Sequence, residues 1–121
     1  MKNSEASADS RLQNQAWICS EFGDYQNLEL KHISIENPEK DQLVIQNQVV
    51  SLGFPDLLMV QGKYQLKPPL PFIPGTEFCG RVLQVGSKSS KFPVGSTVIG
   101  SVRYGASAKY LIASESDCMS L

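Results

Sequence analysis

The stretch SLGFPDLLMVQGKYQLKPPLPFIPGTEFCGRVLQVG, residues 51–86, contains a marked change of pattern within an otherwise strand-like chain. Its first part predicts a short helix, because Pro55 suits a first helical turn, Asp56 is acidic near the helix start and Gly62 suits a C-terminal cap. The four prolines that follow predict an extended, stiff loop. The stretch then ends in a strand that closes on Gly86.

Short strands are predicted on both sides of this stretch. The segment NLELKHISI alternates, and its apolar residues are expected on the buried side: Leu28, Leu30, Ile33 and Ile35. In QLVIQNQVVSLGF the adjacent apolar residues Val49 and Val50 predict a β-bulge. Further strands are predicted in AWICS, STVIGSV and SAKYLIAS. This order predicts a mainly β fold, either a partly open barrel or a sandwich, with one short helix.

The first fifteen residues, MKNSEASADSRLQNQ, differ in composition from the rest of the chain. They are rich in Ser, Asn and Gln and lack the apolar segment of a secretory signal, which predicts a disordered polar tail over residues 1–15 and a domain over 16–121. Eleven basic and twelve acidic residues leave a net charge of −1, which gives no electrostatic footprint for nucleic acid or an anionic membrane. No apolar run approaches the length of a membrane span.

The cysteines and the single histidine do not form a pattern typical of a site. Cys19, Cys79 and Cys118 are widely spaced and odd in number, which argues against a disulfide framework and a structural zinc site. We expect them to be small buried apolar residues in a reducing compartment, the cytoplasm being the expected location. His32 is expected at an exposed strand position, and no spacing supports a catalytic triad.

Several short motifs occur together in a fixed order. Residues 54–64 read F-x-D-x-x-x-x-x-G-x-Y, a proline-rich loop follows, and then come PGTExxG at 74–80, VG at 85–86 and VGSTVIG at 94–100. This array resembles the N-terminal, GroES-like catalytic domain of the medium-chain dehydrogenase/reductase superfamily, and within it the zinc-free quinone oxidoreductases, also called zeta-crystallin-like. The likeness runs from about residue 17 to the C-terminus and is dense over residues 51–100. It implies a GroES-like, partly open β-barrel with one short helix.

The resemblance also indicates how this chain departs from the zinc-dependent relatives. There, the positions of Gly53 and Thr76 carry a cysteine and a histidine that bind catalytic zinc. Glycine offers no side chain and a threonine hydroxyl is a poor zinc ligand, so the resemblance implies that this chain holds no metal. In the family, the carboxylate of Glu77 sits near the cleft between two domains. We expect it to be a buried acid that is hydrogen-bonded to backbone N–H groups or paired with a base, rather than a proton donor, and no catalytic residue is assigned.

Two groups of site residues follow from the resemblance. The turn and helix start are expected against the nicotinamide end of NADPH: Gly53, Phe54, Pro55 and Asp56. The substrate cleft is expected beside Tyr64, Thr76 and Glu77. Many of these relatives carry asparagine at the position of Gly53 and tyrosine at that of Leu58, so a polar cofactor contact and an aromatic wall are expected to be missing here.

The function implied by the resemblance is hydride transfer from NADPH to a quinone or an α,β-unsaturated carbonyl compound. No G-x-G-x-x-G follows a strand in this chain, so we expect the nucleotide-binding Rossmann half to lie outside it and the chain to be inactive alone. The expected partners are the small-molecule substrate, the missing half and a second copy of the full-length protein. The alternative is a non-enzymatic GroES-like module for binding or regulation, which a stop codon after residue 121 would favour.

Overall fold

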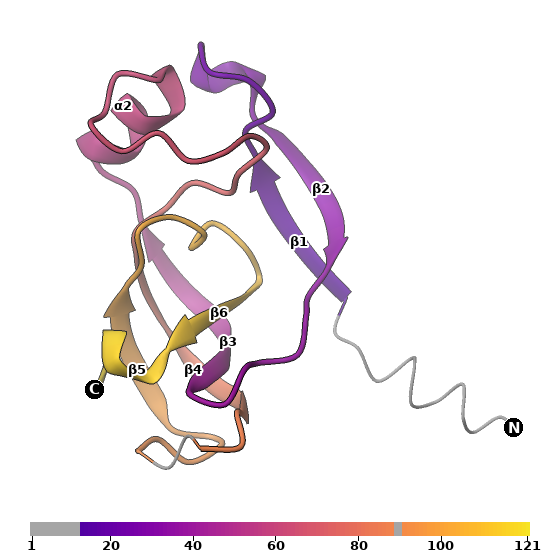
Figure 1. Cartoon of the computed structure of the whole chain (residues 1–121), viewed down its shortest axis with the longest axis vertical. Helices are drawn as coiled ribbons and strands as arrows, with labels where there is room; N and C mark the ends of the chain where they lie inside the picture. Colours follow the sequence, from indigo (N-terminus) through magenta and orange to yellow (C-terminus); the bar gives the residue numbers. More distant parts are fainter. Residues whose placement is uncertain (1–12, 89–90) are drawn as a thin grey trace, which may run out of the picture.

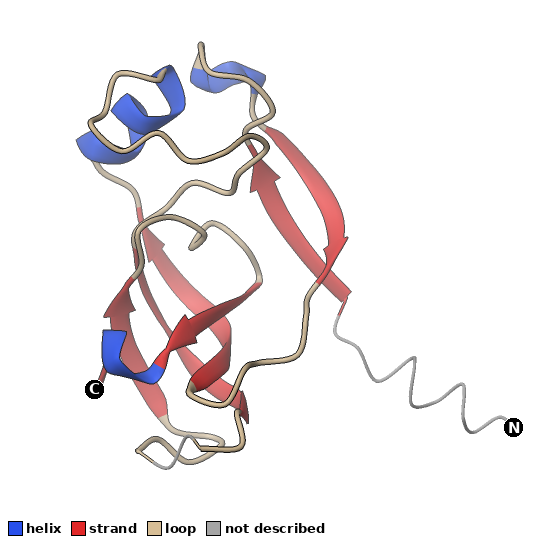
Figure 2. Ribbon diagram, viewed as in Figure 1, coloured by secondary structure: helices blue, strands red, loops and turns tan. Residues whose placement is uncertain are grey.

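The computed structural model describes residues 13–88 and 91–121. Its strands and helices follow one another as shown in Figures 1 and 2: β1 (Gln13–Ile18), η1 (Tyr25–Asn27), β2 (Glu29–Ser34), β3 (Gln42–Ser51), α2 (Phe54–Gln61), β4 (Glu77–Val85), β5 (Thr97–Ser101), β6 (Tyr110–Ser114), η2 (Glu115–Asp117) and β7 (Cys118–Ser120). The elements η1 and η2 are single 3₁₀ turns. The predicted mainly β fold with one short α-helix is confirmed.

The strands form two antiparallel sheets. One is the hairpin β1–β2, and the other has five strands in the order β6-β3-β4-β5-β7. Neither sheet closes on itself in the described part of the chain, which agrees with a partly open GroES-like fold. Two isolated bridges, Ala16 with Ala108 and Cys19 with Phe72, connect β1 and the residue that follows it to loops of the larger body.

The main core lies against the five-stranded sheet. It contains apolar residues from all five strands together with the loop residues Phe92 and Ala106. The strand residues are Leu43, Ile45, Phe78, Val82, Val98, Leu111, Ala113 and Cys118. The pairing of β3 with β4 shifts register between Val44 and Ile45 and again between Asn47 and Val49. An irregularity was predicted at Val49 and Val50, so the second shift lies just before that pair.

The helix α2 has the ends that the sequence predicts. Pro55 lies in its first turn, and the Asp56 carboxylate accepts a hydrogen bond from the Gly53 backbone N–H at 2.7 Å. Gly62 ends the helix with a left-handed φ of 74°, a conformation that glycine adopts without a Cβ penalty. The helix packs through Met59 and Val60 on a second cluster that contains Cys19 and Phe72. It lies at the same end of the molecule as η1 (Figure 1).

Two predictions at the N-terminal side are wrong. β1 begins at Gln13, so residues 13–15 belong to a strand and not to the tail; residues 1–12 lie outside the described residues. The reason is Asn14, which is buried and holds β1 to β6 by donating to Tyr110 O and accepting from Tyr110 N, both at 2.9 Å.

The burial pattern of the hairpin also differs from the prediction. Leu30 is 53% exposed, and Leu28 is half-buried but precedes β2. Ile33 and Ile35 are half-buried, and His32 is exposed as expected. Within the described residues β2 pairs only with β1, so alternation in its sequence does not place one side against the core.

The described residues include no helix that is long and apolar enough to cross a bilayer, since α2 has eight residues.

Candidate ligand-binding cavity

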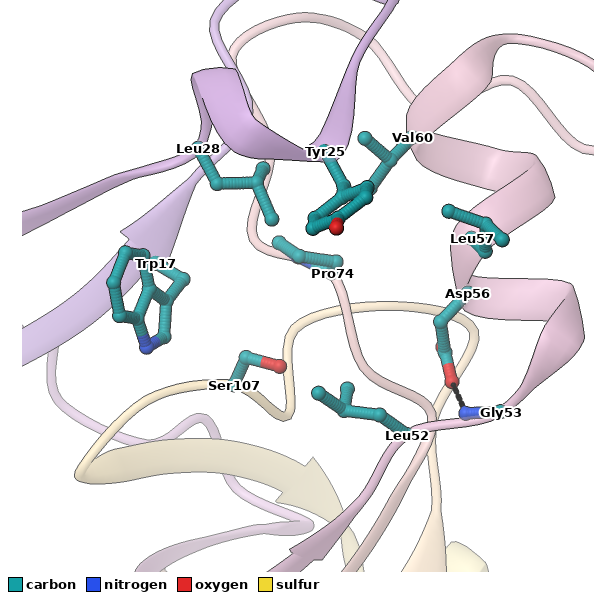
Figure 3. Close-up of a pocket in the computed structure, with 10 residues that line it drawn as sticks. All are labelled: Trp17, Tyr25, Leu28, Leu52, Gly53, Asp56, Leu57, Val60, Pro74 and Ser107. Atoms are coloured by element: carbon teal, nitrogen blue, oxygen red, sulfur yellow. Dashed lines mark hydrogen bonds between the residues drawn. The ribbon is translucent and has the colours of Figure 1, made fainter.

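A cavity of about 590 Å³ opens between α2, the end of β1 with its connection to β2, and the loop before β6. Ten residues line it (Figure 3): Trp17, Tyr25, Leu28, Leu52, Gly53, Asp56, Leu57, Val60, Pro74 and Ser107. Its volume lies in the usual range for small-molecule sites, and its walls are mainly aromatic and aliphatic with a few polar groups. Such a composition suits an apolar ligand that is held in orientation by a small number of hydrogen bonds.

The junction of β3 and α2 forms one wall. Gly53 is the N-cap of α2 and has extended backbone with φ of −134°, which any residue can adopt. A Cβ built on Gly53 would meet nothing closer than Pro55 Cδ at 3.6 Å. The absence of a side chain therefore leaves this wall open, and neither backbone strain nor crowding requires glycine here.

Asp56 supplies the first buried polar group of the cavity. The residue is only 6% exposed, and its Oδ2 atom accepts the hydrogen bond from Gly53 N–H. Its Oδ1 atom is buried and has no hydrogen-bond partner among residues 13–88 and 91–121. The carboxylate lies in the first turn of α2, where the helix dipole stabilises a negative charge.

Ser107 supplies the second buried polar group, from the loop before β6. The residue is 9% exposed, its N–H donates to Pro74 O at 2.9 Å and its C=O accepts from Trp17 N–H at 3.0 Å. The hydroxyl Oγ is buried and, within the described ranges, has no hydrogen-bond partner. Gly75, with φ of 102°, allows this approach, because a Cβ there would lie 2.6 Å from Ser107 Oγ.

Asn47 of β3 holds the Ser107 loop from the sheet side. Its amide nitrogen donates to Ala106 O and Ala108 O, both at 2.8 Å, so the backbone on each side of Ser107 is fixed. Asn47 Oδ1 is the third buried side-chain oxygen without a partner in the described chain. The backbone position of Ser107 is therefore set by the sheet and not by the loop alone.

The structure places the residues expected at the cofactor in two environments. Gly53 and Asp56 line the cavity. Phe54 is 69% exposed and Pro55 is exposed, so both lie on the outer surface beside the cavity mouth. A role for these four residues at the nicotinamide stays a prediction.

The residues expected at the substrate cleft lie apart from this cavity. Tyr64 is half-buried and packs against the second core cluster, and Thr76 is half-buried with its C=O accepting from Val102 N–H at 2.7 Å. Glu77 lines a separate groove of about 450 Å³ with Cys79 of β4 and residues of β5 and β7. None of the three is among the residues that line the larger cavity.

The prediction that Glu77 is a buried acid is wrong. Glu77 is exposed at the first position of β4, paired with Ser51 and Ser101 of the neighbouring strands. The alternation of β4 turns the next residue, Phe78, into the main core, so the Glu77 side chain points to the other face. The buried carboxylate of this region is that of Asp56 and not that of Glu77.

Sequence reasoning missed the cavity residues that lie far apart in the chain. Ser107 occurs in an ordinary turn-to-strand segment, and Tyr25 lies in a 3₁₀ turn that was not predicted. Trp17, the only tryptophan, was assigned to a strand without a role. Its 45% exposure, unusual for so large an apolar side chain, is visible only in the structure.

The three cysteines are free thiols. Cys19 and Cys118 are buried as expected, whereas Cys79 is half-buried. Burial raises the pKa of the Cys19 thiol above its ordinary value of 9.0, and it raises the pKa of Cys118 to about 11, with Asp117 and Glu115 acting in the same direction. Both groups are therefore protonated at neutral pH. Among the described residues, no three His, Cys, Asp or Glu side chains form a group that could hold a metal ion.

Comparison with known proteins identifies the family. Residues 39–121 match the alcohol dehydrogenase GroES-like domain, which is more than half of the chain. The chain belongs to this family. The GroES-like chain is also 40% identical over 90 residues to a quinone oxidoreductase-like protein 2 homolog of Nematostella vectensis, an alignment that covers 74% of the chain and 24% of the relative.

Solved structures agree with that assignment. A quinone oxidoreductase of Pseudomonas syringae matches 89% of the GroES-like chain with a TM-score of 0.84 and 28% identity, over 33% of its own length. A mycobacterial protein in complex with NADPH matches 88% of the chain with a TM-score of 0.81 and 26% identity, over 33% of its length. The GroES-like chain belongs to the quinone oxidoreductase branch of the medium-chain dehydrogenase/reductase superfamily, as predicted, and it spans about a quarter to a third of these relatives.

Proposed function

We propose that this chain forms the substrate side of a zinc-independent, NADPH-dependent oxidoreductase that reduces a quinone or an α,β-unsaturated carbonyl compound. The observation that carries the proposal is the apolar cavity bordered by Gly53 and Asp56, two residues at the expected nicotinamide end. The names of the relatives, quinone oxidoreductases among them, support the substrate class.

The residues present fit a flat cofactor ring at this cavity. Gly53 leaves its wall open, and the exposed ring of Phe54 and the backbone of Pro55 lie beside it. NADPH supplies the hydride when it is bound, and the pyrophosphate and the rest of the nucleotide would be held by a Rossmann half outside this chain. Because this chain would contact only the nicotinamide end of NADPH, we expect the chain alone to bind NADPH with a dissociation constant above about 1 mM.

The acceptor class follows from the residues at the zinc-ligand positions. Gly53 and Thr76 cannot polarise a carbonyl oxygen through a metal, so the acceptor must itself be electron-poor. In a quinone or an enone, the negative charge that hydride transfer creates delocalises onto an oxygen. The apolar side chains of Leu52, Leu57 and Val60 exclude water and position the acceptor. Positioning of this kind is the contribution of this domain to the reaction. Tyr64, Thr76 and Glu77 remain proposed residues of the substrate cleft at the domain boundary.

The test joins this chain to the part that it is expected to need. Residues 13–121 replace the matching domain of the Pseudomonas syringae quinone oxidoreductase, and NADPH absorbance is followed with 1,4-benzoquinone before and after dialysis against a chelator. We expect a saturable rate that survives dialysis, while the 121-residue chain alone shows none. A correctly folded chimera without quinone-dependent NADPH oxidation would contradict the proposal and would favour a non-enzymatic binding module.

A substitution in the cavity wall tests whether the reaction of the chimera takes place at this site. Gly53→Leu fills the open wall and is expected to lower kcat/KM of the chimera by at least tenfold. Val94→Phe, at a loop position that is 61% exposed and lies outside the cavity lining, adds the same number of carbon atoms as Gly53→Leu and should leave the rate within twofold. Equal rates for the two variants would place the reaction elsewhere.

A further inference from the structure

Two oxygen atoms from residues that line one cavity are buried and lack hydrogen-bond partners within residues 13–88 and 91–121. Asp56 Oδ1 and Ser107 Oγ come from α2 and from the loop before β6, and both residues are more than nine-tenths buried. A buried polar atom without a hydrogen bond is costly, and native structures retain few of them. Their meeting in one apolar cavity indicates that a bound molecule supplies the missing bonds.

The two oxygens are held in place by other contacts. Asp56 is oriented by the Gly53 N–H bond to its Oδ2 atom, so Oδ1 is the free end of the carboxylate. Ser107 is fixed by backbone bonds to Pro74 and Trp17, and Figure 3 shows its hydroxyl directed toward the middle of the lining side chains.

The chemistry of the two groups differs, and this difference selects ligands. An ionised carboxylate accepts hydrogen bonds and cannot donate one, whereas a hydroxyl can do both. A ligand that carries only acceptors, such as a quinone or an ether, can satisfy Ser107 but leaves Asp56 Oδ1 unpaired. A ligand with an O–H or N–H group can satisfy Asp56, and a second polar group can satisfy Ser107.

The remaining walls favour a planar ring. Trp17 and Tyr25 are 45% and 57% exposed and border the cavity, and aromatic faces of this kind pack well on another ring. Leu57 and Val60 of α2 and Leu52 of the β3 end provide aliphatic contact from other elements (Figure 3).

We propose that this cavity binds planar ring compounds that carry a hydroxyl or N–H donor in preference to rings of the same size that carry acceptors only, through Asp56 Oδ1 and Ser107 Oγ. Under the proposed function, on which the catalytic meaning of this preference rests, the cavity favours the hydroquinone over the quinone. Under that function, the hydroquinone is expected to inhibit by competing with the quinone for this cavity.

The direct test compares two probes on the 121-residue chain. Hydroquinone, kept reduced under anaerobic conditions, and 1,4-dimethoxybenzene share the ring, but the second has lost both donors. Each is titrated while the indole N–H signal of Trp17, the only tryptophan, is followed by NMR. We expect hydroquinone to bind at least fivefold more tightly, the difference typical of one added hydrogen bond.

Three variants assign the preference to these atoms. Ser107→Ala is expected to weaken hydroquinone binding several-fold. Asp56→Asn, whose amide nitrogen can face the cavity while its oxygen keeps the Gly53 bond, should remove most of the preference, because an amide N–H donates to a hydroxyl and to a methoxy oxygen alike. Ser101→Ala, an exposed serine outside this cavity, is the control and should change neither affinity.

The outcomes separate this inference from the proposed function. Affinities within twofold of each other, no binding of either probe, or no effect of Ser107→Ala would overturn the inference and indicate that water satisfies the two oxygens. A chimera that still turns over quinone would leave the proposed function intact in that event. A clear donor preference combined with an inactive chimera would sustain the binding site and reject the oxidoreductase proposal.

Discussion

The five-stranded sheet and the α2 end of the molecule satisfy their buried groups in different ways. In the sheet, Leu43, Ile45 and Val82 are completely buried, and the backbone is paired strand to strand. At the α2 end, Asp56 and Ser107 keep buried oxygens without partners in the described chain, beside large apolar side chains that are half exposed. The difference indicates that the sheet contributes most of the stability, while two oxygen atoms at the cavity are left for hydrogen bonds to a ligand.

The largest expected effect concerns the sheet core. Ile45→Ala removes a fully buried side chain and should lower the free energy of unfolding by about 2–5 kcal/mol, because the packed core cannot collapse around the lost volume. Leu52→Ala, at a cavity residue that is 67% exposed, should change it by less than about 0.5 kcal/mol. Urea unfolding of both variants measures the contrast, and a similar loss at the two positions would show that the cavity wall is part of the core.

The second pair compares buried polar groups with and without partners. Asn14→Ala breaks the bonds to Tyr110 and should cost about 2–3 kcal/mol, since it removes both partners of a partly buried N–H and C=O. Ser107→Ala removes a hydroxyl that has no partner in the described residues and should leave stability unchanged or raise it by up to about 1 kcal/mol. Thermal and urea unfolding provide the measurement. A clear loss of stability for Ser107→Ala would mean that its hydroxyl is bonded in solution, which would weaken the binding inference.

The third pair places the same substitution at the two ends of α2. Gly62→Ser puts a side chain at a φ of 74°, 3.0 Å from Phe22, and should destabilise by about 1–2 kcal/mol. Gly53→Ser enters extended backbone with free space and a serine that suits an N-cap, so the change should stay within about 0.5 kcal/mol. The midpoint of urea unfolding decides between them, and equal losses would contradict the open wall that we assign to Gly53.

A further expected effect is a pH dependence of the stability of the sheet core. Because the folded pKa of Cys118 is about 11 against an ordinary 9.0, the fold favours the protonated thiol. This contribution is complete below pH 9 and is lost as the pH rises from 9 to about 11, since the unfolded chain releases its proton first. Unfolding at pH 8 and pH 10.5 should therefore show a smaller alkaline loss for Cys118→Ala than for the unchanged chain. An identical pH slope in both would show that other groups cause the whole alkaline loss.

The sequence was most informative where local chemistry decides the structure. Pro55, Asp56 and Gly62 specify the start and end of α2 through backbone geometry and capping alone, and the structure confirms each. The proline-rich loop and the glycine-bounded strands were predictable for the same reason. The short final strand β7 and the 3₁₀ turns were not predicted, because three-residue elements carry no period of their own.

The errors occur where burial depends on a distant segment. Leu30 alternates as if one face of β2 were covered, yet within the described chain its strand pairs only with β1. Residues 13–15 are polar and were assigned to a tail, but Asn14 is buried against Tyr110, nearly a hundred residues later. Glu77 was expected to be buried because of its place in a motif, and the pleat of β4 turns it outward.

By itself the sequence determined the family, the mainly β fold and the ends of helix α2, because motif order, capping and turn residues act over a few positions. Only the tertiary structure decided the cavity. Trp17, Pro74 and Ser107 meet there because the Trp17–Ser107 and Pro74–Ser107 backbone bonds bring three separate segments together, and no local pattern encodes such a contact. Whether a polar side chain finds its partner depends on these distant neighbours, so the two unpartnered oxygens that motivate the binding inference could be found only in the folded chain.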